Sequence, residues 1–330
     1  MTPSSSSIRS IAIGCGSYLP KNIVTNDDLA KKMDTSDEWI KSRTGIFQRH
    51  IAADGEHTSD LASKAAQNAL TQAGIDASSI DLIILATTTP DNTFPSSATR
   101  VQHLLNIKSS AAFDIQAVCS GFIYALATAD SFIRTGQAKR VLVIGAETLS
   151  RILDWNDRRT CVLFGDGAGA VILEGQEVED STNNRGILST HLYSDGSARD
   201  ILFVDGGPGS INHKTGCIRM EGQEVFKHAI QKLTSCTKSA LEANHLTVED
   251  IDWVIPHQAN QRILDGVIKK LRAPKSKLIS TVNHHANTSA ASIPLAIADA
   301  VADKKIQRGD LLALQAIGGG LTWGSALIRW

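Results

Sequence analysis

Length, composition and charge limit what this chain can be. It has 330 residues, 42% of them hydrophobic, and a formal net charge of -1, which indicates a globular protein large enough for two core-forming units. So small a charge gives no bulk attraction for a polyanion, so we expect no nucleic-acid binding, and an acidic partner would need a local basic patch. No apolar run approaches the roughly 18 residues of a membrane span. Since the start also lacks a secretory signal, we expect a cytoplasmic protein without membrane contact.

The cysteines give no sign of disulfides or of a metal site. Their number, five, is odd, and none are spaced C-x-x-C, which argues against a disulfide framework and against thiolate-bound zinc. The neighbouring His284 and His285 would point to opposite faces of an extended chain, so they would not reach one ion together. We therefore expect no metal, and we expect most of the cysteines to be structural.

Helices and strands alternate along the chain. In chain order, the pattern predicts a helix over 58–73, a strand over 80–84, a helix over 121–135, strands over 141–146 and 169–173, a helix over 222–243, a strand over 251–255, a helix over 292–305, and strands over 311–316 and 325–329. The strands are short apolar runs, which is typical of strands covered on both faces. This alternation predicts an α/β protein with mainly parallel, helix-covered sheets.

The chain repeats itself once. When the sequence is compared with itself, 68–85 matches 239–256, and at nearly the same offset 141–146 matches 311–316. The period is too long for a solenoid, whose repeats span about 20 to 50 residues, so the repeat is a duplicated α/β domain. A polar, aperiodic stretch marks the boundary, which predicts one half at 1–178 and another at 179–330.

Cys119 is the candidate nucleophile. The segment 114–127 ends a strand, turns on small residues and places Cys119 at the first turn of an apolar helix. Backbone N–H groups and the helix dipole favour negative charge there, so we expect the pKa of the thiol to fall below its usual value of about 8.5. A lone cysteine is also commonly a buried apolar residue, so the assignment depends on the residues that accompany it.

Two downstream segments supply such residues. His257 and Asn260 follow a predicted strand, and Asn287 precedes the helix at 292–305. A cysteine with a distant histidine and asparagine is a pattern of nucleophilic catalysis, although each segment alone could be turn or cap chemistry. The helices after Cys119 and Asn287 align in the same self-comparison, at an offset close to that of the strands, so we expect both residues at equivalent helix starts. His257 should lie at the carboxyl edge of its sheet, where ligands collect.

Together with several other motifs, these segments resemble the beta-ketoacyl-[acyl-carrier-protein] synthase III family of thiolase-like condensing enzymes. The resemblance covers nearly the whole chain and rests on residues 35–46, 114–127, 164–170, 221–227, 257–260, 287–292 and 318–326. It implies a thiolase-like fold, in which two duplicated α/β halves with helix-covered mixed sheets form a layered αβαβα architecture.

The resemblance also implies a reaction. Cys119 would be acylated by a short acyl-CoA, with acetyl-CoA as the expected primer, and His257 and Asn287 would stabilise the enolate formed when malonyl-[acyl carrier protein] loses CO2. The enolate would attack the acyl group, whose oxyanion would lie between the N–H groups of Cys119 and Gly319. This makes the chain an acyltransferase that starts type II fatty acid synthesis, producing 3-oxoacyl-[acyl carrier protein] and CoA without a metal or organic cofactor.

A site for the CoA nucleotide is implied as well. Trp39 and Arg158 would sandwich the adenine, a use of aromatic and guanidinium planes that stacking and cation–π attraction explain. Thr35, Arg43 and Asn260 would lie close to the CoA.

Other residues would serve the acyl chain and the partners. Phe94 would cross the interface of a homodimer to close the acyl pocket, which Ile317 also lines. Arg262, Lys269 and Lys270 share one helical face and would dock the acidic carrier protein.

Two residues depart from the family pattern. Ala286 stands where glycine is usual, just before Asn287, and Ile317 stands where phenylalanine commonly precedes the glycine run. Ala286 predicts a changed turn at the amide, and both departures bear on primer preference rather than on the reaction type.

Three alternatives remain open from the sequence. A quinolone-type or polyketide condensing enzyme would use the same residues, often on CoA-bound rather than carrier-bound substrates. A cysteine hydrolase would need a base bonded to the thiol and would release free acid. A dinucleotide oxidoreductase would need a G-x-G-x-x-G motif that neither 14–16 nor 165–169 provides.

Overall fold

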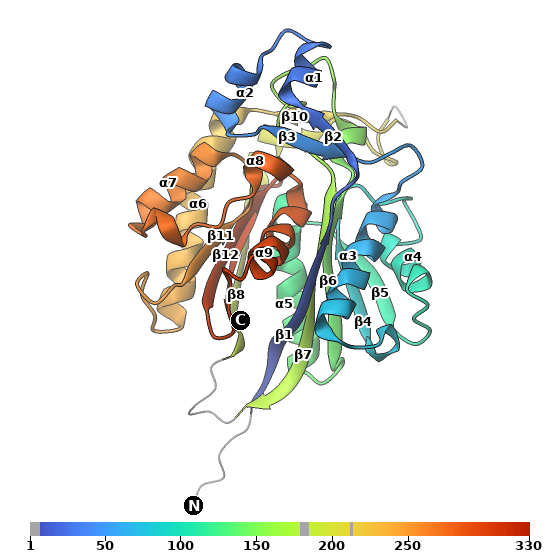
Figure 1. The fold of residues 1–330 in the computed structure, drawn as a ribbon, viewed down its shortest axis with the longest axis vertical. Helices are drawn as coiled ribbons and strands as arrows, with labels where there is room; N and C mark the ends of the chain where they lie inside the picture. Colours follow the sequence, from blue (N-terminus) through green and yellow to red (C-terminus); the bar gives the residue numbers. More distant parts are fainter. Residues whose placement is uncertain (1–6, 179–184, 212–213) are drawn as a thin grey trace, which may run out of the picture.

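The chain folds into five layers, with helices outside, two large sheets beneath them and two helices at the centre (Figure 1). This computed structural model describes residues 7–178, 185–211 and 214–330. One cluster of buried apolar side chains surrounds the two central helices, and one further cluster lies between each sheet and its outer helices. The layered αβαβα architecture expected from the sequence is therefore confirmed.

The first sheet has the strand order β1-β7-β6-β4-β5. Its strands are β1 (Ser7–Tyr18), β4 (Leu82–Ala86), β5 (Ala111–Ile115), β6 (Arg140–Glu147) and β7 (Gly167–Val178). β4 is parallel to β5 and β6, whereas β7 is antiparallel to β6 and β1.

The second sheet repeats this arrangement with the order β11-β12-β13-β8. Its strands are β8 (Gly186–Ser194), β11 (Trp253–Pro256), β12 (Leu311–Gly318) and β13 (Thr322–Arg329). β11 is parallel to β12, and β13 is antiparallel to β12 and β8. A parallel bridge from Val254 to Leu278 lies where β5 pairs with β4 in the first sheet.

Both sheets are mixed, so the expectation of mainly parallel sheets from the alternating pattern is wrong. The reason lies in the connections. Only residues 319–321 join β12 to β13, and so short a link can join only antiparallel neighbours. β6 and β7 are likewise joined through the short η3 (Leu149–Ile152) rather than through a crossover helix.

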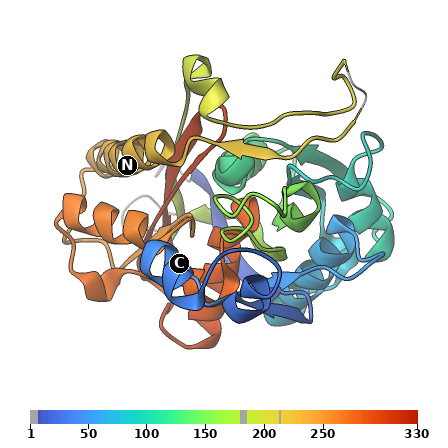
Figure 2. The same ribbon diagram turned by 90° about the horizontal axis from the view of Figure 1, so that it is seen from above.

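Helices cover both sheets and fill the space between them (Figures 1 and 2). The first sheet carries α3 (Thr58–Ala73) and α4 (Ser97–Leu104), the second carries α6 (Gly222–Ala243) and α7 (Gln261–Leu271), and α5 (Gly121–Arg134) and α9 (Ser292–Ala302) form the centre. The helices expected over 58–73 and 222–243 are confirmed. The two central helices end before the expected 135 and 305, at Arg134 and Ala302.

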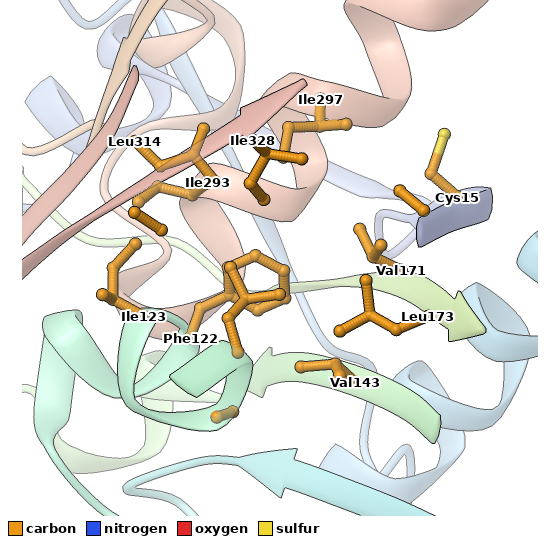
Figure 3. Close-up of a cluster of buried hydrophobic side chains, with 14 of the residues drawn as sticks. Cys15, Phe122, Ile123, Val143, Val171, Leu173, Ile293, Ile297, Leu314 and Ile328 are labelled. Atoms are coloured by element: carbon orange, nitrogen blue, oxygen red, sulfur yellow. The ribbon is translucent and has the colours of Figure 1, made fainter. Parts of the chain in front are cut away.

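The central layer forms the largest part of the core (Figure 3). Phe122 and Ile293, from the two central helices, are buried between Val143 of the first sheet and Leu314 of the second. A helix in this layer has a sheet on either side, so α9 is apolar around nearly its whole circumference. Each fully buried side chain of this kind contributes about 1.5–3 kcal/mol, which holds both central helices in place between the sheets.

The internal repeat is confirmed, but the equivalence of Cys119 and Asn287 is wrong. The turns η2 (Val118–Ser120) and η6 (Ser289–Ala291), which precede α5 and α9, are separated along the chain by the same interval as β6 and β12. Val118 and Ser289 even share a left-handed backbone, with φ of 50° and 48°. Ala290 is therefore the counterpart of Cys119, while Asn287 lies before the turn. The predicted boundary between the halves falls largely on 179–184, outside the described residues.

A cap of short elements lies above the carboxyl ends of the central strands (Figure 1). It contains β2 (Asn22–Thr25), α1 (Asn26–Ala30), α2 (Asp37–Thr44), β3 (Gln48–Ile51), β9 (Leu202–Val204), β10 (Ile218–Met220) and α8 (Val282–His285). Further short turns are η1 (Ala77–Ser79), η4 (Gly196–Ile201) and η5 (Lys275–Lys277). Among the described residues, no helix has the length and apolarity needed to cross a bilayer.

Candidate active site

Cys119 lies in η2, directly before α5, as its sequence segment predicts. It is only 5% exposed, and Gly318 packs so closely that a Cβ there would lie 2.6 Å from the Cys119 backbone nitrogen. Burial, with a smaller contribution from the nearby Glu147 charge, raises the pKa of the Cys119 thiol to about 12. The expectation of a lowered pKa is wrong because the loss of solvent outweighs the position at the helix start.

His257 follows β11 directly and is buried as a neutral ring. Its Nδ1 lies 2.7 Å from the Ser292 hydroxyl, and burial lowers the pKa of His257 to about 3. The Ser292 oxygen also accepts the Gln258 N–H at 3.2 Å, so its own proton can point at Nδ1. We assign the remaining imidazole proton to Nε2 on this basis, which makes His257 a neutral N–H donor.

Asn287 is held in one orientation by its neighbours. Its Oδ1 accepts the Ser289 N–H at 2.9 Å, so the Nδ2 amide group is left as a donor. Its backbone N–H donates to Leu163 O at 2.9 Å, and its carbonyl accepts the Gly165 N–H at 3.0 Å. Ala286, just before it, has φ 58° and ψ -160°, a backbone region that is populated almost only by glycine. Ala286, the departure from the family pattern noted in the sequence, thus adopts a strained backbone in this turn.

The structure brings Cys119, His257 and Asn287 together around one cavity of about 290 Å³. Ile317 lines the same cavity beside them. A thiol and two neutral N–H donors that line one cavity suit covalent acyl transfer followed by stabilisation of a developing oxyanion. The apolar wall of the cavity includes Phe226 and Leu233 of α6. Phe226 belongs to the motif at 221–227, but no sequence pattern assigned either residue a role in the site.

Trp39, Arg43 and Asn260 line the same cavity. The guanidinium of Arg43 lies 4.6 Å from the Trp39 ring centre and that of Arg158 lies 5.1 Å from it, with Arg158 paired to Asp34. Stacking an adenine between two planes needs about 7 Å, twice an ordinary contact distance. The predicted sandwich therefore requires Arg158 to move outward.

Thr35 and Gly319 are placed by their neighbours. The Thr35 hydroxyl is buried and has no partner in the described part of the chain. A Cβ on Gly319 would lie 2.7 Å from Leu202 O, whereas the glycine packed on the Cys119 nitrogen is Gly318. Among the described residues, the Gly319 N–H donates to no acceptor. The role predicted for it stays a prediction.

The residues predicted to meet partners lie on the surface. Phe94 is 83% exposed, in the loop between β4 and α4, and does not line the cavity of this single chain. Arg262, Lys269 and Lys270 are exposed on α7. The Arg262 guanidinium lies 5.6 Å from the ring of Phe226, so it stands beside the cavity wall.

Comparison with known proteins identifies the family. The model described as 3-oxoacyl-[acyl-carrier-protein (ACP)] synthase III matches residues 113–196, and the model of its C-terminal part matches 241–330. The chain is 63% identical over 324 residues to the beta-ketoacyl-[acyl-carrier-protein] synthase III of Bradyrhizobium diazoefficiens, covering 98% of this chain and 99% of that protein. The chain belongs to the 3-oxoacyl-[acyl-carrier-protein] synthase III family.

Solved structures agree with this membership. The 3-oxoacyl-[acyl-carrier-protein] synthase III of Aquifex aeolicus superposes with a TM-score of 0.91 at 49% identity, covering 97% of this chain and 100% of that one. The priming beta-ketosynthase of the R1128 polyketide pathway also reaches 0.91, at 30% identity, with 99% and 98% covered. The synthase III fold is thus shared with a polyketide enzyme, one of the alternatives that the sequence left open.

Several residues around the site were missed by the sequence. Ser292 lies within a quoted motif, but nothing in the motif shows that it contacts His257. Glu147, at the end of β6, is fully buried and accepts hydrogen bonds from Thr88 and Thr89. Burial raises its pKa. The sequence signal that could have identified Glu147 is a carboxylate at the end of an otherwise apolar strand.

Proposed function

We propose that this chain condenses a short-chain acyl-CoA with malonyl-[acyl carrier protein], the initiating condensation of type II fatty acid synthesis. The observation that carries the proposal is the cavity that Cys119 lines together with the neutral donors His257 and Asn287. The relatives support the same reaction, since they include a beta-ketoacyl-[acyl-carrier-protein] synthase III at 63% identity.

The first half-reaction transfers the acyl group to Cys119. The sulfur attacks the thioester carbonyl of acyl-CoA, a bond from Sγ to the acyl carbon forms, and the bond from that carbon to the CoA sulfur breaks. The thiol proton leaves Cys119, and CoA departs as a thiol, so the protons balance. The Cys119 and Gly319 N–H groups are proposed to stabilise the oxyanion between these events.

The second half-reaction uses the donors of the other half. The malonyl thioester loses CO2, and the negative charge moves to the thioester oxygen, where His257 Nε2–H and Asn287 Nδ2–H would stabilise it. The enolate carbon then attacks the acyl carbon, the bond to Sγ breaks, and Cys119 takes up a proton. No step uses a metal or an organic cofactor.

The binding roles follow from position. Trp39, Arg158, Arg43, Thr35 and Asn260 would hold the CoA nucleotide at the cavity mouth, with Arg158 moving outward to admit the adenine. The exposed cations of α7, Arg262, Lys269 and Lys270, would dock the acidic carrier protein.

We further propose a homodimer in which Phe94 enters the partner's acyl pocket. Phe94 is 83% exposed on the loop between β4 and α4, which suits such a contact. Symmetric dimers are also the commonest oligomers. Light scattering at working concentration should give twice the chain mass. A monomer with full activity would contradict this.

The proposal is tested by intact-protein mass spectrometry after incubation with a series of acyl-CoAs, beside release of labelled CO2 from malonyl-[acyl carrier protein]. One acyl group per chain, followed by carrier-dependent CO2 release, is expected. Equal use of malonyl-CoA would favour a polyketide-type enzyme, and accumulation of free acid would favour a hydrolase.

A further inference from the structure

Arg49, on β3, is a buried cation, and among the residues that the structure describes no carboxylate accepts its hydrogen bonds. It is 0% exposed, and its guanidinium donates to Val24 O at 3.2 Å, Asn26 Oδ1 at 2.8 Å and Val162 O at 2.8 Å. All three acceptors are neutral. Burial lowers the pKa of Arg49 to about 10, so it remains charged at neutral pH. Burying a charge without an anion is unfavourable, so its hydrogen bonds must serve something else.

One of those bonds fixes the segment that carries Asn287. We call residues 162–165 the strap. Arg49 holds the strap at Val162 O, and the next carbonyl, Leu163 O, accepts the Asn287 N–H at 2.9 Å. Gly165 N–H donates to Asn287 O at 3.0 Å, so the strap and Asn287 form a short parallel bridge. The guanidinium thus lies one residue away from the backbone of the amide donor.

The turn at Asn287 needs such support. Ala286 has φ 58° and ψ -160°, and Ser289 has φ 48°, so residues on both sides of the amide are in disfavoured backbone regions. Each costs about 1–3 kcal/mol and persists only where surrounding contacts hold it. The strap supplies the two backbone hydrogen bonds that hold Asn287 between them.

The other end of the guanidinium reaches the cap. Asn26, whose Oδ1 accepts from Arg49, donates through Nδ2 to Asp37 Oδ1 at 2.9 Å and to Ile46 O at 2.8 Å. Asp37 is the first residue of α2, the helix that bears Trp39. A chain of polar contacts therefore runs from the partly exposed Asp37 at the start of α2, through buried Asn26 and Arg49, to the strap and Asn287.

We propose that Arg49 is a positioning residue for the second half-reaction, because it fixes the strap that holds the Asn287 amide toward the cavity. This inference rests on the proposed role of Asn287. Arg49 touches no substrate in this arrangement. Its effect should fall on decarboxylation rather than on acylation of Cys119, because its hydrogen bonds lead to Asn287 and none of them reaches the turn η2 that carries Cys119.

The test compares the half-reactions in Arg49→Lys. Lysine keeps the charge but is a single point donor, so it cannot hold Asn26 and Val162 together as the guanidinium does. CO2 release from malonyl-[acyl carrier protein] should fall about 10- to 100-fold, the size expected when a catalytic group shifts by about 1 Å. Acylation of Cys119, followed by mass spectrometry, should change less than about twofold.

A second variant acts on the strap and leaves Arg49 itself unchanged. A Cβ on Gly165 would lie 3.0 Å from His285 O and 3.1 Å from Arg49 Cβ, so Gly165→Ala must shift the strap slightly. It should reproduce the selective loss of CO2 release in weaker form. This variant decides the matter if Arg49→Lys fails to fold, as judged by thermal unfolding.

Arg134→Lys is the control for the same replacement at another guanidinium: Arg134, on α5, likewise donates to a backbone carbonyl, that of Ile187, and pairs in addition with the Asp130 carboxylate. It should leave both half-reactions unchanged. If the Arg49 and Gly165 variants keep full CO2 release, or lose acylation equally, the inference is overturned. If Asn287→Ala itself keeps CO2 release, the proposed role of Asn287 fails instead.

Discussion

The two helix starts at the centre of the molecule share a backbone but not a function. η2 and η6 have the same length, each begins with a residue in the left-handed backbone region, and each is followed by a central helix, α5 or α9. In the first half the middle residue is the nucleophile Cys119. In the second it is Ala290, whose carbonyl packs so tightly that a Cβ on Gly145 would lie 2.2 Å from it.

This difference teaches that duplication preserved the scaffold and divided the chemistry. The second half uses η6 for packing and carries its polar groups outside this turn. His257 follows β11, and Asn287 lies just before η6. One half therefore carries the proposed nucleophile, and the other half carries the proposed enolate donors. Variants that separate the two half-reactions test this division directly.

The largest expected effect is that of Cys119→Ala. It should abolish the acyl-enzyme, because no other cysteine lies in the cavity lining and the covalent step needs a sulfur. Mass spectrometry of the intact variant after incubation with acyl-CoA checks this. Acylation retained at Cys15, Cys161, Cys217 or Cys236 would contradict the assignment of Cys119 as the nucleophile of the first half.

Next come His257→Ala and Asn287→Ala. Each should accept the acyl group almost normally but lose decarboxylation by about 10²- to 10³-fold, since their donors act on charge that develops only in the second transition state. Single-turnover transfer from acyl-CoA is measured beside labelled CO2 release. Equal loss of both steps would show that these residues activate the thiol, and the division between halves would be wrong.

A smaller effect is expected for Ser292→Ala. Without the hydroxyl 2.7 Å from Nδ1, neutral His257 divides between two tautomers, so fewer molecules present Nε2–H. CO2 release should fall by about the five- to tenfold that one lost hydrogen bond of roughly 1 kcal/mol allows. Nitrogen chemical shifts of the His257 ring report the tautomer independently. An unchanged tautomer with unchanged CO2 release would reject the assignment.

The smallest effect concerns stability. Ala286→Gly should raise the free energy of unfolding by about 1 kcal/mol, because glycine adopts φ 58° without strain. Ala290→Gly is the matched control: Ala290 has no positive φ, so glycine there should lower stability by a similar amount. Denaturant unfolding of both variants measures this. If both variants changed the free energy of unfolding in the same direction, the proposed strain at Ala286 would be contradicted.

Much of the scaffold could be predicted from sequence. Helical periodicity gave the bounds of α3 and α6, and self-comparison revealed the repeat, because both depend on local patterns of apolar residues. The three catalytic candidates were also identifiable, since cysteine, histidine and asparagine after apolar runs are uncommon together. The alternating pattern by itself missed the mixed strand directions, which the family resemblance implied, since these directions depend on how chain connections cross the sheet edge.

Tertiary structure alone decided the chemical state of the site. The thiol pKa near 12 and the imidazole pKa near 3 both result from burial by segments distant in sequence, which outweighs any local effect of the helix start. The contact from Arg49 to Val162 and on to Asn287 likewise joins three parts of the chain that no local pattern relates. Sequence determines which groups are present, whereas long-range packing determines their solvation and orientation, and these set their reactivity.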